Sequence, residues 1–326
     1  MKRMITIAAR CCIAAVAISA SGLATAASSY PVKPVSLVVV FGPGGTSDIV
    51  ARLVGQALDS ELKQQVVVEN RPGASGNIGA SYVARSAPDG YTLLAGFPGL
   101  TTNGALYSKL NYNPSADFAP ISRLASAPNV IVVNSELPAK TLDELLKYAR
   151  SRSGEMNFGS AGAGSSSHLA GELLNELAGL KLTHIPYKGG APALTDLAAG
   201  RLDVMVIPLP EAYSLIQSGK IRPLALASPN RSTLLPDVPT TKEAGLANFE
   251  VGSWYGLMAP AGTPADVIAK LSAATTRALQ TSAIKEAFEK RGIDLVGSNP
   301  AQFKEFLDNE TERWTAVIKS KQIKLD

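Results

Sequence analysis

Short apolar runs alternate with longer amphipathic segments through most of this 326-residue chain, and that alternation is the strongest constraint on its fold. The runs are typical of buried strands, and the segments between them have helical spacing. Strands connected through helices usually pair in parallel, so the pattern predicts an α/β fold with largely parallel strands. The predicted strands are 35–41, 66–69, 92–96, 130–133, 156–159, 182–186, 204–207, 223–226, 256–259 and 293–296.

About ten strands are more than one comfortable doubly wound sheet, so we predict two α/β lobes. The chain is expected to cross into the second lobe near 125–128 and to return near 245–249. This assigns 27–125 and 249–326 to the first lobe and 126–248 to the second. Two crossings of this kind would form a hinge that allows closure around a ligand.

The first 26 residues are predicted to be a secretory signal peptide that is cleaved after Ala26. Lys2, Arg3 and Arg10 are followed by an uncharged stretch, 11–20, and then by the small residues ATA. A membrane anchor is the alternative, but the apolar stretch is short and lacks a stop-transfer flank.

Cleavage would change both the charge and the thiol content of the chain. Loss of three basic residues leaves 28 against 27 acidic residues, so the net charge falls from +4 to +1. That balance does not indicate nucleic-acid binding. Cys11 and Cys12 would also be removed, which leaves no thiol for redox, metal or nucleophilic chemistry.

Three helix starts carry explicit signals. Thr141 and Glu144 match a capping box, Thr263 precedes Pro264, and Asn299 precedes Pro300. Each pair predicts an N-cap residue at the first position.

A glycine-rich loop, FGPGGTSD at 41–48, follows the first predicted strand and opens a helix. Thr46 or Ser47 is expected to cap that helix near Asp48. Free N–H groups at such a helix start form an anion site. The loop matches neither a P-loop nor the dinucleotide fingerprint, and a turn without any ligand is the alternative.

Two further loops repeat the order of strand, glycine turn and helix. The segment GSAGAGSSSHLAGELL, 159–174, places three serines at a helix start and is the strongest candidate anion site. The segment HIPYKGGAPALTDL, 184–197, adds a tyrosine and a lysine. The segments NRPGASGNIGA and GFPGLTTN also follow predicted strands, and ligands bind at such strand ends in open α/β sheets.

Catalytic and metal sites are not expected. His168 is predicted to lie in the first turn of a helix, where it caps the helix or lines the cleft, and His184 is predicted to lie on a strand. Residues one to three positions apart at a helix start rarely point at each other, which argues against a Ser-His dyad at 165–168, and no G-x-S-x-G elbow is present. The histidine spacing fits no metal motif, and no cofactor is expected.

Several segments resemble the Bug or TctC family, the periplasmic receptors of tripartite tricarboxylate transporters. They include YPVKPVSLVVVFGPGGTSDIVARLV, VVVENRPGASGNIGA, PDGYTLL, LPAKTLDELLKYAR, NFGSAGAGSSSHLAGELL, HIPYKGGAPALTDLAAGRLD, LPDVPTTKEAG and WYGLMAPAGTP. The resemblance implies a two-lobed Venus-flytrap fold of the type II periplasmic binding protein kind, with no enzymatic activity. It also implies a periplasmic protein, expected as a monomer, that delivers a small organic acid to membrane permease subunits of the TctA and TctB type.

The resemblance further implies that the ligand carboxylate is held between the first glycine loop and the serine loop, partly through water. The residues carried over by this likeness are Gly44, Gly45, Thr46, Asp48, Ser160, Gly164, Ser165, Ser166, His168, Tyr187, Lys188 and Gly189.

The chain departs from the family where members often read Met-Phe-Asp. Here Met205 is followed by Val206, Ile207 and Pro208, so a carboxylate is expected to be missing. This favours a plain monocarboxylate or dicarboxylate, including aromatic ones, over an amino acid. Two other functions stay open at this point: a receptor that signals to a membrane sensor, and a secreted hydrolase that uses a Ser-His pair.

Overall fold

The computed structural model describes residues 30–320, and the predicted signal peptide lies outside that range. Residues 33–320, which are described here, form an α/β structure whose strands are connected largely through helices. The elements are β1 (Val35–Val39), α2 (Thr46–Leu62), β2 (Val66–Asn70), η1 (Ala74–Gly76), α3 (Asn77–Ala84), β3 (Thr92–Gly96), α4 (Gly99–Leu106), β4 (Phe118–Asn134), α5 (Leu142–Ser151), β5 (Asn157–Ser160), α6 (Ser166–Ala178), β6 (Thr183–Pro186), α7 (Gly190–Ala198), β7 (Val204–Pro208), α8 (Leu209–Gln217), β8 (Ile221–Leu226), β9 (Gly252–Pro260), α9 (Ala265–Gln280), α10 (Ser282–Glu289), β10 (Asp294–Leu295) and α11 (Pro300–Ser320).

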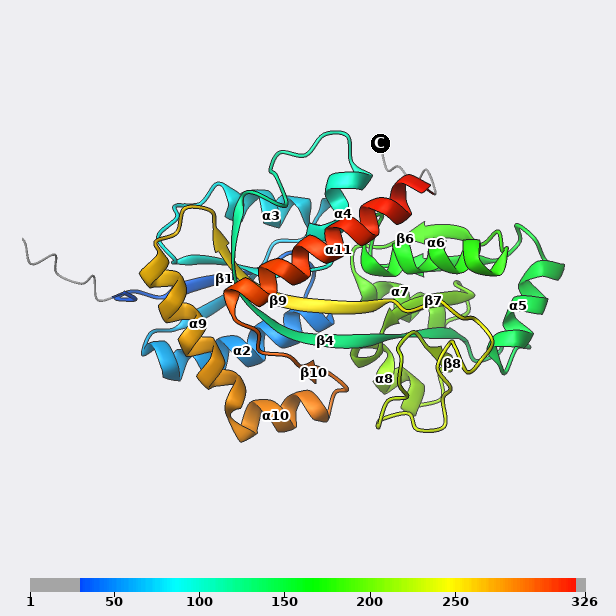
Figure 1. Cartoon of the computed structure of the whole chain (residues 1–326). Coiled ribbons are helices and arrows are strands. Elements are labelled where there is room, and N and C mark those ends of the chain that lie inside the picture. Colours follow the sequence, from blue (N-terminus) through cyan, green and yellow to red (C-terminus); the bar gives the residue numbers. More distant parts are fainter. Residues whose placement is uncertain (1–29, 321–326) are drawn as a thin grey trace, which may run out of the picture. The chain divides into compact units, whose positions relative to one another are not determined.

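The strands form two sheets that share one long strand. The first sheet has the order β2-β1-β3-β9-β4, with β10 also paired to β4, and the second has the order β6-β5-β7-β4-β8. Strand β4 pairs with β9 over Phe118–Pro128 and with β7 from Asn129 onward. It therefore runs from one sheet into the other, as Figure 1 shows. The exact lobe boundaries stay a prediction.

Each predicted strand overlaps an observed one, but the expectation of largely parallel pairing was wrong for half of the fold. Strands β1, β2 and β3 are parallel to one another, as are β5, β6 and β7. The pairings of β4, β8, β9 and β10 are antiparallel. The long return segments set the direction of these strands, and local hydrophobicity carries no information about direction.

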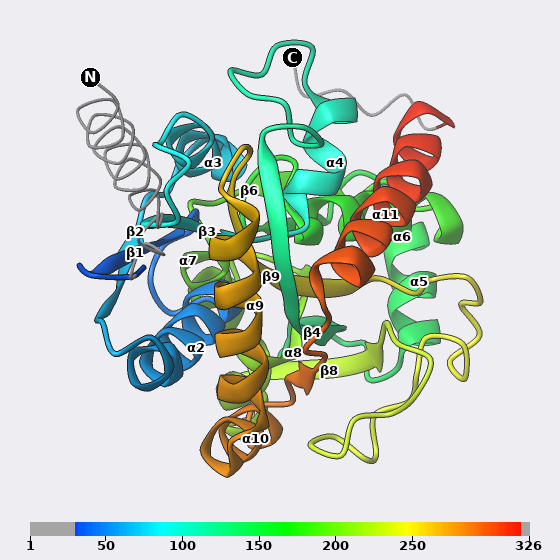
Figure 2. The same ribbon diagram turned by 60° about the vertical axis from the view of Figure 1, so that its left-hand side comes forward.

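Both faces of the second sheet are buried at its central strands, β4 and β7. Along β4 the side chains alternate: Val130 and Val132 pack in the core beside α7 and α8, whereas Ile131 and Val133 pack in the core beside α5 and α6. Figure 2 shows the helices around this strand from a second side. A strand that is buried on both faces has no polar alternation, which explains its continuous apolar sequence.

The helix starts agree only in part with their sequence signals. Thr141 accepts a hydrogen bond from the Glu144 N–H, and Asn299 and Gln302 exchange two bonds at the start of α11. The expectation for Thr263 was wrong, because its hydroxyl donates to the Pro260 carbonyl and α9 begins after Pro264 without a side-chain cap.

Candidate ligand-binding site

A cavity lies where the carboxyl ends of strands from both sheets meet. This position is the one at which open α/β sheets bind ligands. The lining residues are Phe41, Gly42, Pro43, Gly45, Thr46, Ser47, Ser75, Phe97, Pro98, Gly99, Ala161, Ser165, Ser166, Ser167, Lys188, Gly189, Gly190, Ala191, Pro192, Ile207, Pro208, Glu211, Ser253 and Tyr255.

The first glycine loop opens α2 without a side-chain cap of its own. Gly45 is the N-cap residue, and neither Thr46 nor Ser47 caps the helix, which corrects the sequence-based expectation. The N–H and the hydroxyl of Thr46 instead donate to the Glu211 carboxylate, at 3.0 and 3.2 Å. Since Glu211 lies on α8 beside the second sheet, the cap of α2 comes from across the cavity.

Asp48 shapes this loop from behind. Its carboxylate accepts bonds from the Gly44 N–H at 3.1 Å, from Arg52 at 3.0 Å and from Asn70 at 2.9 Å. Burial alone would raise the pKa of Asp48, but these donors outweigh it and lower the pKa. Asp48 is therefore a fixed anion that holds the turn, and it does not line the cavity.

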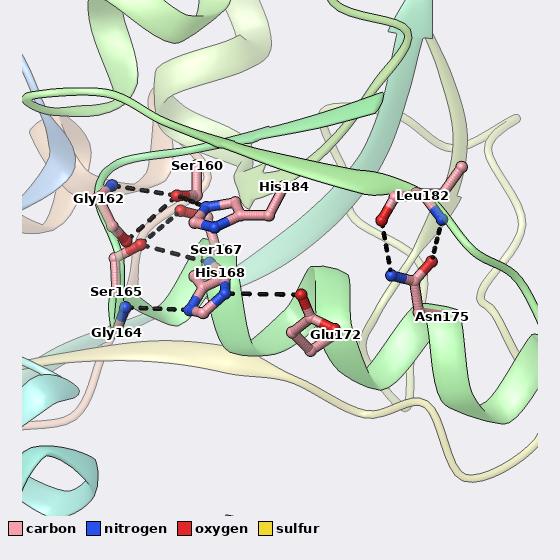
Figure 3. Close-up of polar contacts among 10 residues, drawn as sticks. All are labelled: Ser160, Gly162, Gly164, Ser165, Ser167, His168, Glu172, Asn175, Leu182 and His184. Atoms are coloured by element: carbon pink, nitrogen blue, oxygen red, sulfur yellow. Dashed lines mark hydrogen bonds and ion pairs between the residues drawn. The ribbon is translucent and has the colours of Figure 1, made fainter. Parts of the chain in front are cut away.

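The serine loop forms a hydrogen-bonded start to α6, drawn in Figure 3. Ser165 is the N-cap residue, and its hydroxyl accepts the N–H of His168 and contacts Ser167. Ser167 in turn accepts the N–H of Ala161 at 2.9 Å. Ser166 faces the cavity, where its hydroxyl lies 3.4 Å from that of Ser253 on β9. The serines thus fix the loop and leave the first turn of α6 directed at the cavity.

Two histidines support this loop from the core. His168 is buried, its Nδ1 accepts the Gly164 N–H at 3.0 Å, and its Nε2 lies 3.6 Å from Glu172. The ring of His184 stacks on that of His168 with centroids 3.9 Å apart. Burial and the nearby charge of His168 lower the pKa of His184 to about 4, so this ring is neutral at pH 7.

A serine hydroxyl does contact a histidine ring, but this serine is not placed where a hydrolase would need its nucleophile. Ser160 lies 2.6 Å from His184 Nε2, but it is fully buried, outside the cavity lining, and bonded to both the N–H and the carbonyl of Gly162. Ser166, which does line the cavity, pairs with Ser253 and with no histidine among residues 30–320. A buried hydroxyl beside an imidazole of low pKa is poorly suited to attack a substrate.

The third loop brings a cation to the edge of the cavity. Lys188 is exposed and lines the cavity together with Gly189. The preceding Tyr187 lines a neighbouring cavity instead, and its hydroxyl donates to Asp196 at 2.6 Å.

Glu211 is a charged cavity residue that was not predicted from the sequence. It is partly buried, and burial raises the pKa of its carboxyl group, although the bonds from Thr46 act in the opposite direction. Tyr255 lies close by on β9, and burial together with the charge of Glu211 raises the pKa of its phenol. The expectation that this part of the chain lacks a carboxylate was wrong, because Glu211 enters from the first turn of α8, four residues after Ile207.

Among residues 30–320, no group of three or more His, Cys, Asp and Glu side chains is arranged to hold a metal ion. Over the same range no helix is long and apolar enough to cross a membrane.

Comparison with known proteins places this chain in a family. The TctC family, described as the tripartite tricarboxylate transporter family receptor, matches residues 50–323. The chain belongs to this family. Protein BugT of Bordetella pertussis is 37% identical to this TctC-family protein over 312 residues, which cover 94% of this chain and 96% of BugT.

Solved structures agree with this assignment. The structure of R. palustris Rpa4515 with adipate is 38% identical, has a TM-score of 0.88 and covers 91% of this chain and 100% of its own. The periplasmic binding protein BugD is 35% identical, with a TM-score of 0.87 and the same coverage. This TctC-family chain therefore has the two-lobed α/β fold of periplasmic binding proteins, and its family is one of solute receptors.

The structure brings part of the predicted site to one cavity. Of the twelve residues named from sequence, the cavity is lined by Gly45, Thr46, Ser165, Ser166, Lys188 and Gly189. Gly44, Asp48, Ser160, Gly164 and His168 lie behind the loops and hold their shape. The residues missed include Ser47, Ser75, Phe97, Gly190, Glu211, Ser253 and Tyr255. Ser47, Ser75, Phe97 and Gly190 lie in loops that the sequence already marked as strand ends. Glu211 carries a weaker signal, as an acid in the first turn of a helix that follows a strand, and Ser253 and Tyr255 carry none.

Proposed function

We propose that this TctC-family protein is an extracytoplasmic receptor that binds a small organic carboxylate in the cavity between its two sheets. The observation that carries the proposal is the start of α6, where a serine-rich first turn faces the cavity. N–H groups in a first helical turn have no intrahelical acceptor, so they bind anions readily. The adipate complex of Rpa4515 adds support from a relative.

The hydroxyl of Ser166 faces the cavity and lies 3.4 Å from that of Ser253. Ser166 therefore belongs to the carboxylate end of the proposed site.

The remainder of the proposal follows from the family. The leader at 1–26 would direct the chain to the periplasm, and the receptor would act as a monomer that delivers its ligand unaltered to permease subunits of the TctA and TctB type. Ligand release would require the lobes to open, because contacts between the loops enclose the cavity.

A thermal-shift screen against mono- and dicarboxylates tests the binding claim, since a ligand that binds only the native state raises its melting temperature. We expect at least one acid to bind with 1:1 stoichiometry and to be recovered unchanged by mass spectrometry. Ser166→Ala should weaken that binding about tenfold, from the loss of one charge-assisted hydrogen bond. Turnover of an ester or amide that stops in Ser166→Ala would instead support the hydrolase.

A further inference from the structure

Glu211 gives the cavity two ends of opposite character. Among the described residues that line it, Glu211 is the single acid and Lys188 the single base. The serine end presents hydrogen-bond donors, whereas Glu211 presents carboxylate oxygens. A ligand that satisfies both ends needs an anionic group at one end and a donor, best a cation, at the other.

The carboxylate of Glu211 has donors but no counter-ion. Its Oε1 accepts both bonds from Thr46, and over residues 30–320 no Lys, Arg or His nitrogen lies within ion-pair distance. Burial penalises a carboxylate in this position and raises its pKa. A cation placed beside Oε2 would remove that penalty.

The backbone around Glu211 is shaped to admit the carboxylate. A Cβ on Gly190 would lie 2.0 Å from Oε2, so a side chain there would displace it. A Cβ on Gly45 would lie 3.6 Å from Oε1. The two glycines come from the third and first loops, and together they leave room for one carboxylate between two helix starts.

Strand β9 carries residues that face both ends. Ser253 contacts Ser166 at the donor end, and the Tyr255 side chain lies beside Thr46 and Glu211 at the acceptor end and also beside Ser253. Ser253 and Tyr255 are on the same face of the strand, with Cα atoms about 7 Å apart at about 3.3 Å per residue. The rings of Phe41, Phe97 and Tyr255 line the cavity and suit an apolar spacer.

We propose that the ligand of this receptor carries a protonated amine, or another organic cation, opposite its carboxylate, and that Glu211 binds this cation. The inference rests on the proposed function, because the carboxylate end is the site argued there. A dicarboxylate would place its second anion beside Glu211, and like charges at this distance repel. Lys188, the one base at the cavity edge, is the partner that a dicarboxylate would use instead.

The test compares acids that differ in one end group. The matched pairs are 6-aminohexanoate with adipate, 4-aminobutanoate with succinate, and 4-(aminomethyl)benzoate with terephthalate, and hexanoate serves as the acid without a second charge. Calorimetric titration of the full mature chain at pH 7 gives each affinity. In the pair of fitting length, we expect the amino acid to bind at least tenfold more tightly than its dicarboxylate and than hexanoate.

Glu211→Gln keeps the shape and the acceptor for Thr46 but removes the charge. We expect it to reduce the ratio of amino acid affinity to hexanoate affinity at least tenfold. Glu312→Gln is the matched control, since Glu312 is exposed on α11 and away from the cavity, and it should change neither affinity. A cooperative thermal unfolding transition of the ligand-free variant shows that it folds. The comparison of ligand affinities in the wild type tests the inference even if the variant does not fold.

Two results overturn the inference and leave the proposed function intact. In the first, a dicarboxylate binds the wild type as tightly as the matched amino acid does, and Lys188→Gln loses affinity for that dicarboxylate. The other is equal binding of hexanoate and 6-aminohexanoate that Glu211→Gln does not change. If no acid of any kind binds, the proposed function fails together with the inference.

Discussion

At the scale of single residues, the charge state of His184 is set by its surroundings. Its ring stacks on Phe158 and His168, and its Nε2 bonds to a buried serine. Burial lowers its pKa from 6.5 to about 4. The unfolded chain therefore binds a proton between pH 6.5 and 4 that the folded chain rejects, so stability is fully present above pH 6.5 and is lost as the pH falls toward 4.

We predict that the wild type loses about 1–2 kcal/mol more stability than His184→Gln between pH 7 and pH 4.5, a figure reduced for the solvent that still reaches the ring. Urea unfolding at both pH values measures this. The variant keeps a hydrogen-bonding group for Ser160 but has no titrating ring. Equal pH dependence in the two proteins would show that protonation of His184 does not limit stability.

Gly164 controls the geometry of the serine loop. Its φ is +84°, and its N–H donates to His168. A β-branched side chain is strained at this backbone angle, at a cost of about 1–3 kcal/mol. We predict that Gly164→Val folds cooperatively with reduced stability and binds its acid more than tenfold more weakly, as measured by calorimetry.

Gly179 offers a matched control at the other end of α6. Its φ is +63°, a Cβ there meets open space, and it does not line the cavity. Gly179→Val should therefore lose similar stability and keep its affinity. If both variants bind as the wild type does, the serine loop is not part of the site.

At the scale of elements, some helix starts are stabilised by residues nearby in the sequence and others by residues far away in it. The start of α11 is stabilised by neighbours along the chain: Asn299 Oδ1 accepts the Gln302 N–H at 2.9 Å, and Gln302 Oε1 accepts the Asn299 N–H at 3.0 Å. The start of α2 depends on Glu211, which is 165 residues away. A short stretch of sequence therefore contains both Asn299 and Gln302, but it cannot contain both Thr46 and Glu211.

Asn299→Ala should lower the free energy of unfolding by about 1 kcal/mol, because an N-cap side chain is replaced by one that cannot accept a bond. Gln302→Ala should cost less, since it removes the secondary partner. Urea unfolding with ligand titration checks both, and affinity should not change because α11 does not line the cavity. A loss of affinity in Asn299→Ala would show coupling between α11 and the site.

At the scale of the whole 33–320 unit, the loops of the two sheets touch outside the cavity lining as well as within it. The Tyr107 hydroxyl, after α4, donates to the Ala163 carbonyl at 3.1 Å, and the Ser75 hydroxyl donates to the same carbonyl. These bonds join the first sheet to the serine loop of the second. They contribute to the closed arrangement. Tyr107 does so without lining the cavity, whereas Ser75 is also a lining residue.

Tyr107→Phe should therefore weaken ligand binding about three- to tenfold through closure alone, the equivalent of one neutral hydrogen bond. Small-angle scattering should show a more open ensemble at partial saturation than in the wild type. Tyr148→Phe is the control, because Tyr148 lies on α5, away from the cavity. Unchanged affinity in Tyr107→Phe would indicate that this bond does not bias the lobes toward closure.

The strand positions, the α/β class and the glycine loops at strand ends could be predicted from sequence. The missed half of β4, 118–129, contains two prolines and small residues, and it becomes a strand through pairing with β9. Gly45, Thr46, Ser165 and Ser166 could be assigned to the site because each lies next to a recognisable turn.

By itself the sequence determined what depends on neighbours along the chain: hydrophobic period, turn residues and the cap at Asn299. The tertiary structure alone decided strand direction, the separation of lining residues from supporting ones such as Asp48 and His168, and the entry of Glu211 into the cavity. The physical reason is that a local pattern fixes backbone angles, whereas burial and charge pairing arise when distant segments come together.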